Sequence, residues 1–215
     1  MIFLRRKGIL IILSSPSGAG KTSLARALVN EDEDLSFSIS ATTRTPRPGE
    51  VDGREYHFVS SKVFEEMKER GEFLEWAEVF GNLYATPISP VNNLLEIGKD
   101  LIFDVDWQGG KQIKASTLKD SVVSIFILPP SINELQRRLV ERAQDTKDIV
   151  KARMEKSMSE ILHWNEYDYV LINKKFEDTL REIKSIISVE RSRLFRTRGL
   201  KEFVTSLNKE FLEIK

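Results

Sequence analysis

The chain has 215 residues, and its 33 Lys and Arg residues balance 33 Asp and Glu residues, so its formal net charge is zero. It contains no cysteine, which excludes disulfide bonds, thiolate catalysis and thiolate zinc sites and is typical of a reducing compartment. A chain of this length buries a sizeable core without such cross-links. The balanced charge argues against nucleic-acid binding, because that affinity comes from an excess of Lys and Arg. We therefore expect one globular domain whose anionic ligands are small and bound locally.

The N-terminal segment could be mistaken for a signal peptide. Its apolar run is split by Arg5, Arg6 and Lys7, and no small-residue cleavage site follows. No stretch of the sequence approaches the roughly 18 apolar residues of a membrane span. We expect a cytoplasmic protein that does not contact membranes.

Short apolar runs rich in β-branched residues recur along the chain without polar alternation, which is typical of strands buried on both faces of a parallel sheet. These runs are Ile9–Leu13, Leu101–Val105, Val122–Leu128 and Tyr169–Ile172. Helical patterns separate them, including an amphipathic stretch over 176–194. Strands that alternate with helices predict an α/β fold with a doubly wound parallel sheet.

The segment 41–92 breaks this alternation. It opens with the Pro- and Gly-rich stretch Thr45–Gly49, and two strand-like runs then flank a short helical pattern. These three patterns lie at 56–59, 73–80 and 63–70. We predict an inserted mixed α/β lobe with its own small sheet.

A second departure from the core pattern is the polar segment Ala143–Asp148, which predicts a small helical lid. The predicted division of the chain is a core of 1–40, 93–137 and 154–215, the inserted lobe of 41–92, and a lid of 138–153.

The first predicted strand runs directly into a glycine-rich loop and then into a helical pattern. The loop reads Ser15-Pro16-Ser17-Gly18-Ala19-Gly20-Lys21-Thr22. It matches the phosphate-loop pattern G-x-x-x-x-G-K-[ST] at every fixed position except the first, where Ser15 replaces glycine. In such a loop the backbone N–H groups converge on phosphate oxygens, Lys21 supplies a charge for the β and γ oxygens, and Thr22 offers its hydroxyl to Mg²⁺. We predict an ATP-binding loop, with an incidental Gly-rich turn as the alternative.

Two acids follow at the carboxyl end of the predicted strand 101–105. Asp104 lies where ligands bind in open α/β sheets, and strand alternation places Asp106 on the same side. A carboxylate within an apolar run needs a partner. The alternative is a structural role, in which the acid caps the next helix.

Three arginines occur where ordinary surface patterning does not explain them. Arg138 and Arg142 lie four apart on one helical face, where like charges repel mildly, so we expect an anion between them. Pairing of Arg138 with Glu134 on a solvated face is the alternative. Arg153 interrupts a mostly apolar stripe, which predicts that it faces inward toward a bound partner.

Further motifs follow the phosphate loop in a fixed serial order. They are Ser40-Ala41-Thr42-Thr43-Arg44-Thr45-Pro46-Arg47-Pro48-Gly49-Glu50, Tyr56, Glu75-Trp76, Gly81-Asn82-Leu83-Tyr84 and Asp104-Val105-Asp106-Trp107-Gln108-Gly109. With them the chain closely resembles the guanylate kinase family over roughly 9–173. The resemblance implies a phosphate-loop core, a lid, and a GMP-binding role for the lobe 41–92. It also implies transfer of the γ-phosphoryl group of ATP to GMP with Mg²⁺.

Carried over residue by residue, the resemblance implies a GMP site in the lobe. Its phosphate-binding side chains would be Arg44, Arg47, Tyr56 and Tyr84, and its guanine-binding side chains would be Ser40, Glu75, Thr86 and Asp104. The chemistry of guanine agrees with this division, because carboxylates can accept its N1–H and 2-amino protons while hydroxyls serve O6. Adenine lacks those donors and would leave the two carboxylates unpaired.

The mechanism implied by the resemblance needs no general base, since the acceptor phosphate is already mostly dianionic at neutral pH. The negative charge on the transferring phosphoryl group would be neutralised by Mg²⁺ held by Thr22 and by the side chains of Lys21, Arg44, Arg138, Arg142 and Arg153. Asp106 would reach the metal through water, and Asn173 would lie near adenine in the ATP site.

Two other functions remain compatible with the sequence. One is a catalytically silent guanylate-kinase-like module that binds a peptide in the GMP cleft, and the other is a phosphoryl transferase with a different small acceptor. The tail beyond about Arg196 lies outside the resemblance and predicts an extra amphipathic helix, which packs on the core or contacts another subunit. We expect a monomer or a homodimer that binds GMP and ATP.

Overall fold

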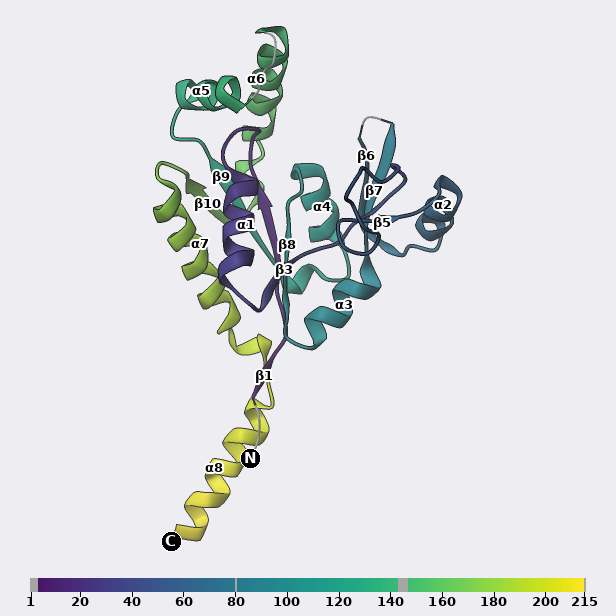
Figure 1. The fold of residues 1–215 in the computed structure, drawn as a ribbon. Helices are drawn as coiled ribbons and strands as arrows, with labels where there is room; N and C mark the ends of the chain where they lie inside the picture. The colour runs from purple at the N-terminus through teal and green to yellow at the C-terminus, as the bar shows by residue number, and fades with distance from the viewer. Residues whose placement is uncertain (1–3, 80, 143–146, 215) are drawn as a thin grey trace.

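The computed structural model describes residues 4–79, 81–142 and 147–214, without the side chains of 142 and 147–149 (Figure 1). Its centre is a five-stranded parallel sheet in the order β10-β9-β2-β8-β3. The strands are β2 (Leu10–Ser14), β3 (Leu35–Phe37), β8 (Asp100–Phe103), β9 (Val122–Leu128) and β10 (Tyr169–Ile172). This order confirms the predicted doubly wound α/β fold. The winding reverses at β2, so the carboxyl end of β2 is the place where such sheets bind ligands.

Strand β2 is buried on both faces, which explains its unbroken apolar sequence. Ile11 and Leu13 pack on one side with residues of α1 (Lys21–Glu31) and α7 (Phe176–Arg191). Leu10 and Ile12 pack on the opposite side with residues of α3 (Ile88–Glu96) and α4 (Trp107–Ala115). The period-2 alternation of a strand thus joins two apolar clusters through one central element.

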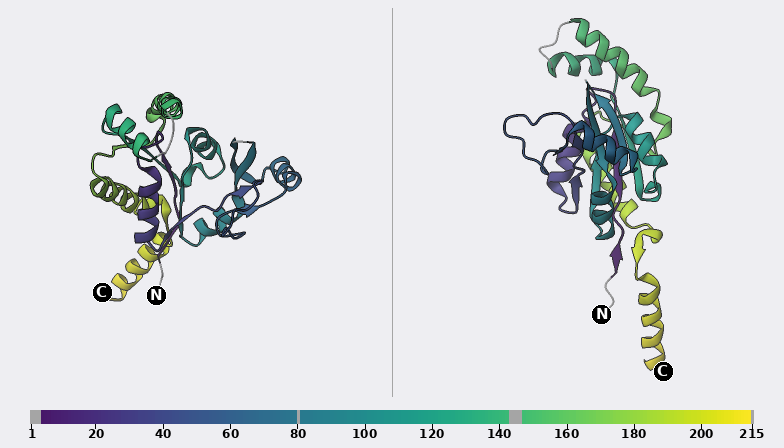
Figure 2. Two further views of the ribbon diagram at one scale, coloured as in Figure 1. Left: turned by 45° about the horizontal axis from the view of Figure 1, so that its top comes forward. Right: turned by 90° about the vertical axis from the view of Figure 1, so that its right-hand side faces the viewer.

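Helices cover both faces of the sheet, as Figures 1 and 2 show. On the second face lie α3 (Ile88–Glu96) and α4 (Trp107–Ala115). Three short 3-10 turns, η1 (Lys119–Ser121), η2 (Trp164–Glu166) and η3 (Leu194–Arg196), connect the remaining elements.

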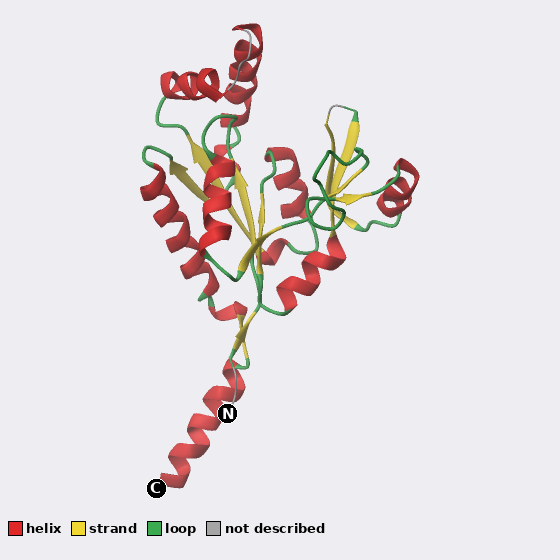
Figure 3. Ribbon diagram, viewed as in Figure 1, coloured by secondary structure: helices red, strands yellow, loops and turns green. Residues whose placement is uncertain are grey.

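The inserted lobe forms a second sheet of four strands, in the order β5-β4-β7-β6, beside the core (Figure 3). Its elements are β4 (Ala41–Thr42), β5 (His57–Phe58), α2 (Ser61–Glu69), β6 (Phe73–Val79) and β7 (Asn82–Pro87). Ser60 caps α2 by accepting a hydrogen bond from the Val63 N–H at 3.3 Å. A small sheet in this segment matches the pattern of the sequence.

Two helices stand above the carboxyl edge of the central sheet (Figure 1). They are α5 (Ile132–Arg142) and α6 (Lys147–Ile161), and the segment predicted as a lid, 138–153, takes in the end of α5 and the first part of α6. Of the polar segment predicted between them, 143–146 lies outside the described residues.

The two ends of the described chain meet at the opposite edge of the sheet. Strand β1 (Arg5–Arg6) pairs with β11 (Thr197–Arg198), and α8 (Leu200–Ile214) then projects away from the other elements (Figures 1 and 2). None of the α8 residues is buried against the described part of the chain. Among the described helices, none has the length and apolar character that a membrane crossing requires.

The same edge is anchored by a fully buried carboxylate. Asp100, at the start of β8, accepts hydrogen bonds from Arg6 Nη1 at 2.5 Å, Arg191 Nε at 2.6 Å and the Ile9 N–H at 2.8 Å. Its charge is therefore compensated by two guanidinium groups, as a buried ion requires. The network ties β1, β2, β8 and α7 together below the site.

One predicted boundary is wrong in a way that matters for the site. Strand β8 ends at Phe103 and α4 begins at Trp107, so Asp104 and Asp106 lie in the connection between them. Strand alternation therefore does not place the two carboxylates on one side, and each has its own set of partners.

Candidate active site

The glycine-rich loop connects β2 to α1 at the carboxyl edge of the sheet. Gly18 and Gly20 have φ values of 89° and 99°, a left-handed region that costs glycine nothing. Gly20 is the N-cap of α1, and a Cβ there would also lie only 2.6 Å from Asn173 Nδ2. The sequence therefore folds into a tight turn whose N–H groups and helix N-terminus face the same space.

Lys21 and Thr22 both contact Asp104. The Lys21 Nζ lies 2.7 Å from Asp104 Oδ1 and also donates to the Val105 carbonyl at 3.1 Å. The Thr22 hydroxyl donates to Asp104 Oδ2 at 3.0 Å. Asp104 thus has the partner that its position required, and that partner is the phosphate loop.

Two cavities meet at Thr22 and Asp104. One, of about 230 Å³, is lined by seven of the loop residues together with Asp104, Asp106 and Glu160. The other, of about 470 Å³, lies toward the inserted lobe, and its lining includes Ser40, Tyr56 and Thr86. A phosphate-binding cavity and a larger cleft therefore share one boundary.

Arg138 reaches from the lid helix α5 to the phosphate loop. Its Nη1 lies 3.5 Å from the Ala19 carbonyl and its Nη2 lies 3.3 Å from the Asn173 carbonyl. Its Nε also donates to Glu134 Oε1 at 2.7 Å, so the surface pair coexists with the loop contact. Hydrogen bonds from Arg137 first and Arg138 second lower the pKa of Glu134 from 4.5 to about 2.

The other two arginines of the predicted lid are Arg142 and Arg153. The side chain of Arg142 lies outside the described residues. Arg153 is exposed on α6, which corrects the prediction that it faces inward. Among residues 150–161 of this helix, whose side chains the structure describes, the buried positions are Ser157 and Glu160.

Asn173 is buried and holds the loop from behind. Its Nδ2 donates to the Ala19 carbonyl at 2.8 Å, and its own N–H donates to the Leu128 carbonyl at 2.8 Å. The residue therefore fixes the loop to the end of β9.

Glu75 and Thr86 form a buried pair on neighbouring strands of the lobe. The two residues face each other in the β6–β7 ladder, and the Thr86 hydroxyl donates to Glu75 Oε1 at 2.7 Å. Burial is the main cause that raises the pKa of Glu75 above its ordinary value of 4.5, and the charge of Asp106 adds to this effect. A carboxylate with one hydroxyl partner is poised to accept further N–H donors.

Asp106 lies in the connection between β8 and α4, where it lines the phosphate-loop cavity. Its Oδ1 accepts hydrogen bonds from the Gln108 and Gly109 N–H groups, both at 3.0 Å, and so caps α4. Asp106 therefore has the structural role of a helix cap, which was the alternative for this residue. Its charge also acts on Glu75. A Cβ at Gly109 would lie 3.5 Å from Glu75 Oε2, which shows how closely the helix start approaches that carboxylate.

Arg44 is held on an aromatic surface by Glu50. Its Nη2 lies 2.9 Å from both Glu50 oxygens, and its guanidinium lies 5.5 Å from the Tyr56 ring centroid. The Arg47 N–H, followed by the Arg44 guanidinium, lowers the pKa of Glu50. Tyr84 meets Tyr56 edge to ring at a centroid distance of 5.9 Å. The structure thus brings Arg44, Tyr56 and Tyr84 together, with Arg47 exposed beside them.

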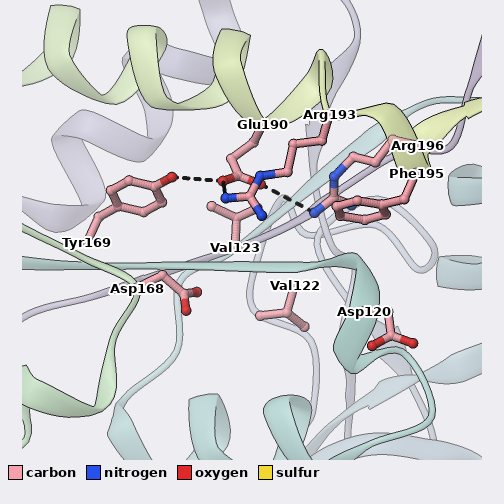
Figure 4. Close-up of a pocket in the computed structure, with 9 residues that line it drawn as sticks. All are labelled: Asp120, Val122, Val123, Asp168, Tyr169, Glu190, Arg193, Phe195 and Arg196. Atoms are coloured by element: carbon pink, nitrogen blue, oxygen red, sulfur yellow. Dashed lines mark hydrogen bonds and ion pairs between the residues drawn. The ribbon is translucent and has the colours of Figure 1, made fainter.

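A larger pocket of about 650 Å³ lies at the opposite edge of the sheet (Figure 4). Its central charge is the buried Glu190, which accepts from Tyr169 Oη at 2.7 Å and pairs with Arg193 at 3.0 Å and Arg196 at 3.5 Å. Glu190 is compensated by these three partners, although Arg196 Nε is buried without a hydrogen-bond partner, and none of the residues that line the pocket belongs to the phosphate loop. We therefore place the active site at the carboxyl edge.

Sequence reasoning missed two residues of the site. Glu50 belongs to the motif Ser40–Glu50, but the sequence assigned it no role of its own. In the structure its carboxylate positions the Arg44 guanidinium. Glu160 was not noticed, although it is buried and its carboxylate touches the loop residue Ser17. No local pattern reveals this contact, because it joins residues 143 positions apart.

Comparisons with known proteins agree with this geometry. A family model described as guanylate kinase matches residues 7–190. A guanylate kinase of Cereibacter sphaeroides is 54% identical over 208 residues, covering 97% of this chain and 99% of the relative. One of Ruegeria pomeroyi is 54% identical, covering 97% and 98%. The crystal structure of guanylate kinase from Anaplasma phagocytophilum superposes with a TM-score of 0.73 at 35% identity, covering 95% of this chain and 97% of that one.

The raised pKa of Glu75 predicts a pH-dependent stability difference. Below pH 4.5 the carboxyl is protonated in the folded and the unfolded chain, and as pH rises through the raised folded pKa the wild type loses stability. Glu75→Gln removes this loss, so its thermal midpoint should exceed that of the wild type by a few degrees at pH 8 and match it near pH 4.

The matched control is Glu78→Gln, which removes an exposed carboxylate from the same strand. Thermal unfolding followed by circular dichroism measures both variants. A Glu75→Gln protein that is less stable than the wild type at pH 8 would contradict a destabilising buried charge.

Proposed function

Because the chain belongs to the guanylate kinase family and transfers the γ-phosphoryl group of ATP to GMP, giving ADP and GDP, we propose that its two adjoining cavities hold the two nucleotides. The observation that carries this proposal is the shared boundary at Thr22 and Asp104, with the phosphate loop on one side and the lobe on the other. Phosphoryl transfer requires donor and acceptor in line at close range, and adjoining cavities provide this arrangement.

On the donor side, the N–H groups of the loop and the N-terminus of α1 bind the ATP phosphates, and Lys21 supplies the charge at the β and γ oxygens. The 2.7 Å pairing of Lys21 with Asp104 keeps this ammonium group at the mouth of the cavity. Asn173 acts from behind the loop through its bond to the Ala19 carbonyl, as a support for the ATP site.

Thr22 and Asp104 fit a magnesium ion that is carried with the nucleotide. The described residues contain no group of three or more acidic, His or Cys side chains that could bind a metal by themselves. A hydroxyl and a carboxylate 3.0 Å apart are the few protein ligands that Mg²⁺ uses when phosphates and water supply the rest. When bound, the ion neutralises charge on the β and γ phosphates.

On the acceptor side, Glu75 accepts the N1–H and 2-amino protons of guanine, and hydroxyls of Thr86 and Ser40 serve the remaining edge. The pairing of Asp104 with Lys21 and Thr22 supports a second role for that residue, at the metal. Its predicted part in guanine binding passes in this proposal to Asp106, whose charge acts directly on Glu75.

Arg44, Arg47, Tyr56 and Tyr84 bind the GMP phosphate in this scheme. The bidentate contact with Glu50 and the surface of Tyr56 orient the Arg44 guanidinium before the substrate arrives, which lowers the entropy cost of binding. The lid arginines Arg138, Arg142 and Arg153 complete the positive surroundings when the lid closes and excludes water.

A catalytically silent peptide-binding module is not favoured, because the phosphate loop keeps its glycine conformations, its lysine and its threonine in one site. We also propose the cytoplasm as the compartment, in agreement with the absence of cysteine.

We further propose that the chain forms a homodimer through α8. The apolar residues Leu200, Val204, Leu207, Phe211 and Ile214 follow one another at steps of four, three, four and three. This spacing is the a/d seam of a coiled coil, which selects another helix of the same kind. Val204, Leu207 and Phe211 are 48%, 45% and 57% exposed, whereas an isolated helix of this length is only marginally stable in water.

An assay with ATP, Mg²⁺ and each nucleoside monophosphate tests the acceptor assignment. The wild type should form ADP rapidly with GMP and little with AMP. Glu75→Gln should lower kcat/KM for GMP at least about tenfold and reduce the preference for GMP, because one acceptor becomes partly a donor. Glu78→Gln serves as the control. Equal wild-type rates with GMP and AMP would remove the guanine assignment.

Light scattering tests the dimer. The wild type should have twice the mass of one chain, and Leu207→Asp should have the mass of one chain and retain activity. Lys209→Asp, on the polar face of α8, should remain dimeric. A wild-type protein with the mass of a single chain at micromolar concentrations would rule out this interface.

A further inference from the structure

The base of the lid helix α6 holds both backbone polar groups of one phosphate-loop residue. Glu160 Oε2 accepts a hydrogen bond from the Ser17 N–H at 3.2 Å, and Ser157 Oγ donates to the Ser17 carbonyl at 3.4 Å. Ser157 is fully buried and Glu160 is 8% exposed, while most residues between 151 and 159 are exposed. The last turns of α6 therefore touch the loop.

A carboxylate in this position needs a strong partner. Glu160 lies in the last turn of α6, where the helix dipole disfavours negative charge, and it is removed from water. Its partners are the Ser17 N–H and Lys156, whose Nζ lies 3.9 Å from Oε1. The exposed lysine contributes little to the stabilisation of the Glu160 charge. The hydrogen bond from the Ser17 N–H is therefore its main source of stabilisation.

The same bond closes the first half of the phosphate loop. The Ala19 N–H already donates to the Pro16 carbonyl at 3.2 Å, and the Ser17 N–H is taken by Glu160. These two N–H groups already have partners within the protein, which leaves the glycine N–H groups and the first turn of α1 to the phosphates. Fixing Ser17 therefore fixes the curvature of the loop just before the positions that bind phosphate.

A second contact fixes the base of the lid from the acceptor side. His163, two residues beyond the end of α6, stacks on Trp107 with ring centroids 3.8 Å apart and an angle of 9° between the rings. Trp107 is the first residue of α4 and follows Asp106 directly. The end of α6 is thus attached both to the phosphate loop and to the connection that carries the two acids.

We propose that Glu160 is a positioning residue for phosphoryl transfer, which clamps Ser17 and so holds the phosphate loop in its ATP-binding form. This inference rests on the proposed function and goes beyond it, because it assigns the base of α6 to the ATP site. The clamp persists in the ATP complex, and Glu160 itself does not touch the transferred group.

The opposite arrangement makes a different prediction. Glu160 also lines the phosphate cavity, so it could act as a stand-in for a phosphate that ATP must displace. A displaced carboxylate competes with ATP, and its removal would strengthen ATP binding. A clamp supports ATP binding, and its removal would weaken it.

Calorimetric titration with ATP in the absence of GMP distinguishes the clamp from a carboxylate that ATP displaces. For Glu160→Ala the clamp predicts ATP affinity at least about tenfold weaker, the effect of losing one charge-assisted hydrogen bond. KM for ATP should rise in parallel, while KM for GMP stays within about twofold. Glu160→Gln should recover most of the affinity, because its amide oxygen can still accept from Ser17.

Glu155→Gln is the matched control, since it removes an exposed carboxylate from the same helix, and it should behave as the wild type. Ser157→Ala, which removes only the weaker half of the clamp, should lower ATP affinity in the same direction and covers the case in which Glu160→Ala does not fold. Stronger or unchanged ATP binding in Glu160→Ala, or in Ser157→Ala where Glu160→Ala does not fold, would overturn the clamp. Failure of the wild type to use GMP would instead overturn the proposed function, and the ATP titrations would still decide the clamp.

Discussion

The site depends on the 2.7 Å pairing of Lys21 with Asp104, at the point where the two cavities meet. A parallel sheet brings the loop after β2 and the connection after β8 to the same edge because the two strands are hydrogen-bonded neighbours. The ammonium group therefore lies beside a carboxylate that lines both cavities. In the proposed function, the other residues of the site orient the two nucleotides relative to this charge.

The protein accepts unfavourable charges in order to prepare this site. Glu75 is a buried carboxylate with a raised pKa, and Glu160 is a second buried carboxylate at the end of a helix. Glu160 is compensated by the Ser17 N–H group, and in the proposed function the N–H groups of guanine do the same for Glu75. Such groups lower stability and gain specificity or positioning, a compromise that is common at active sites.

Much of the fold was predictable because buried parallel strands have a distinct composition. The bounds of β9 and β10 match the predicted runs residue for residue, and the phosphate loop connects β2 to α1 as its motif requires. Strand β3 (Leu35–Phe37) was missed, since three residues carry too little periodicity.

Contacts between distant segments were the part that sequence could not supply. The partners of Asp104 and Asp106 depend on where β8 ends, and a single apolar run does not reveal its last hydrogen-bonded residue. The exposure of Arg153 depends on how α6 rotates against the loop, where Ser157 and Glu160 make the contact instead. Motifs therefore identified the chemistry, and tertiary packing decided which protein groups each acid contacts.

The most direct test of the account is the turnover and GMP affinity of Lys21→Ala. If the Lys21 charge acts on the group in transit, kcat should fall by about two orders of magnitude or more while the dissociation constant of GMP changes less than about threefold. Turnover at the wild-type level, or a loss confined to GMP binding, would contradict the central place given to this charge.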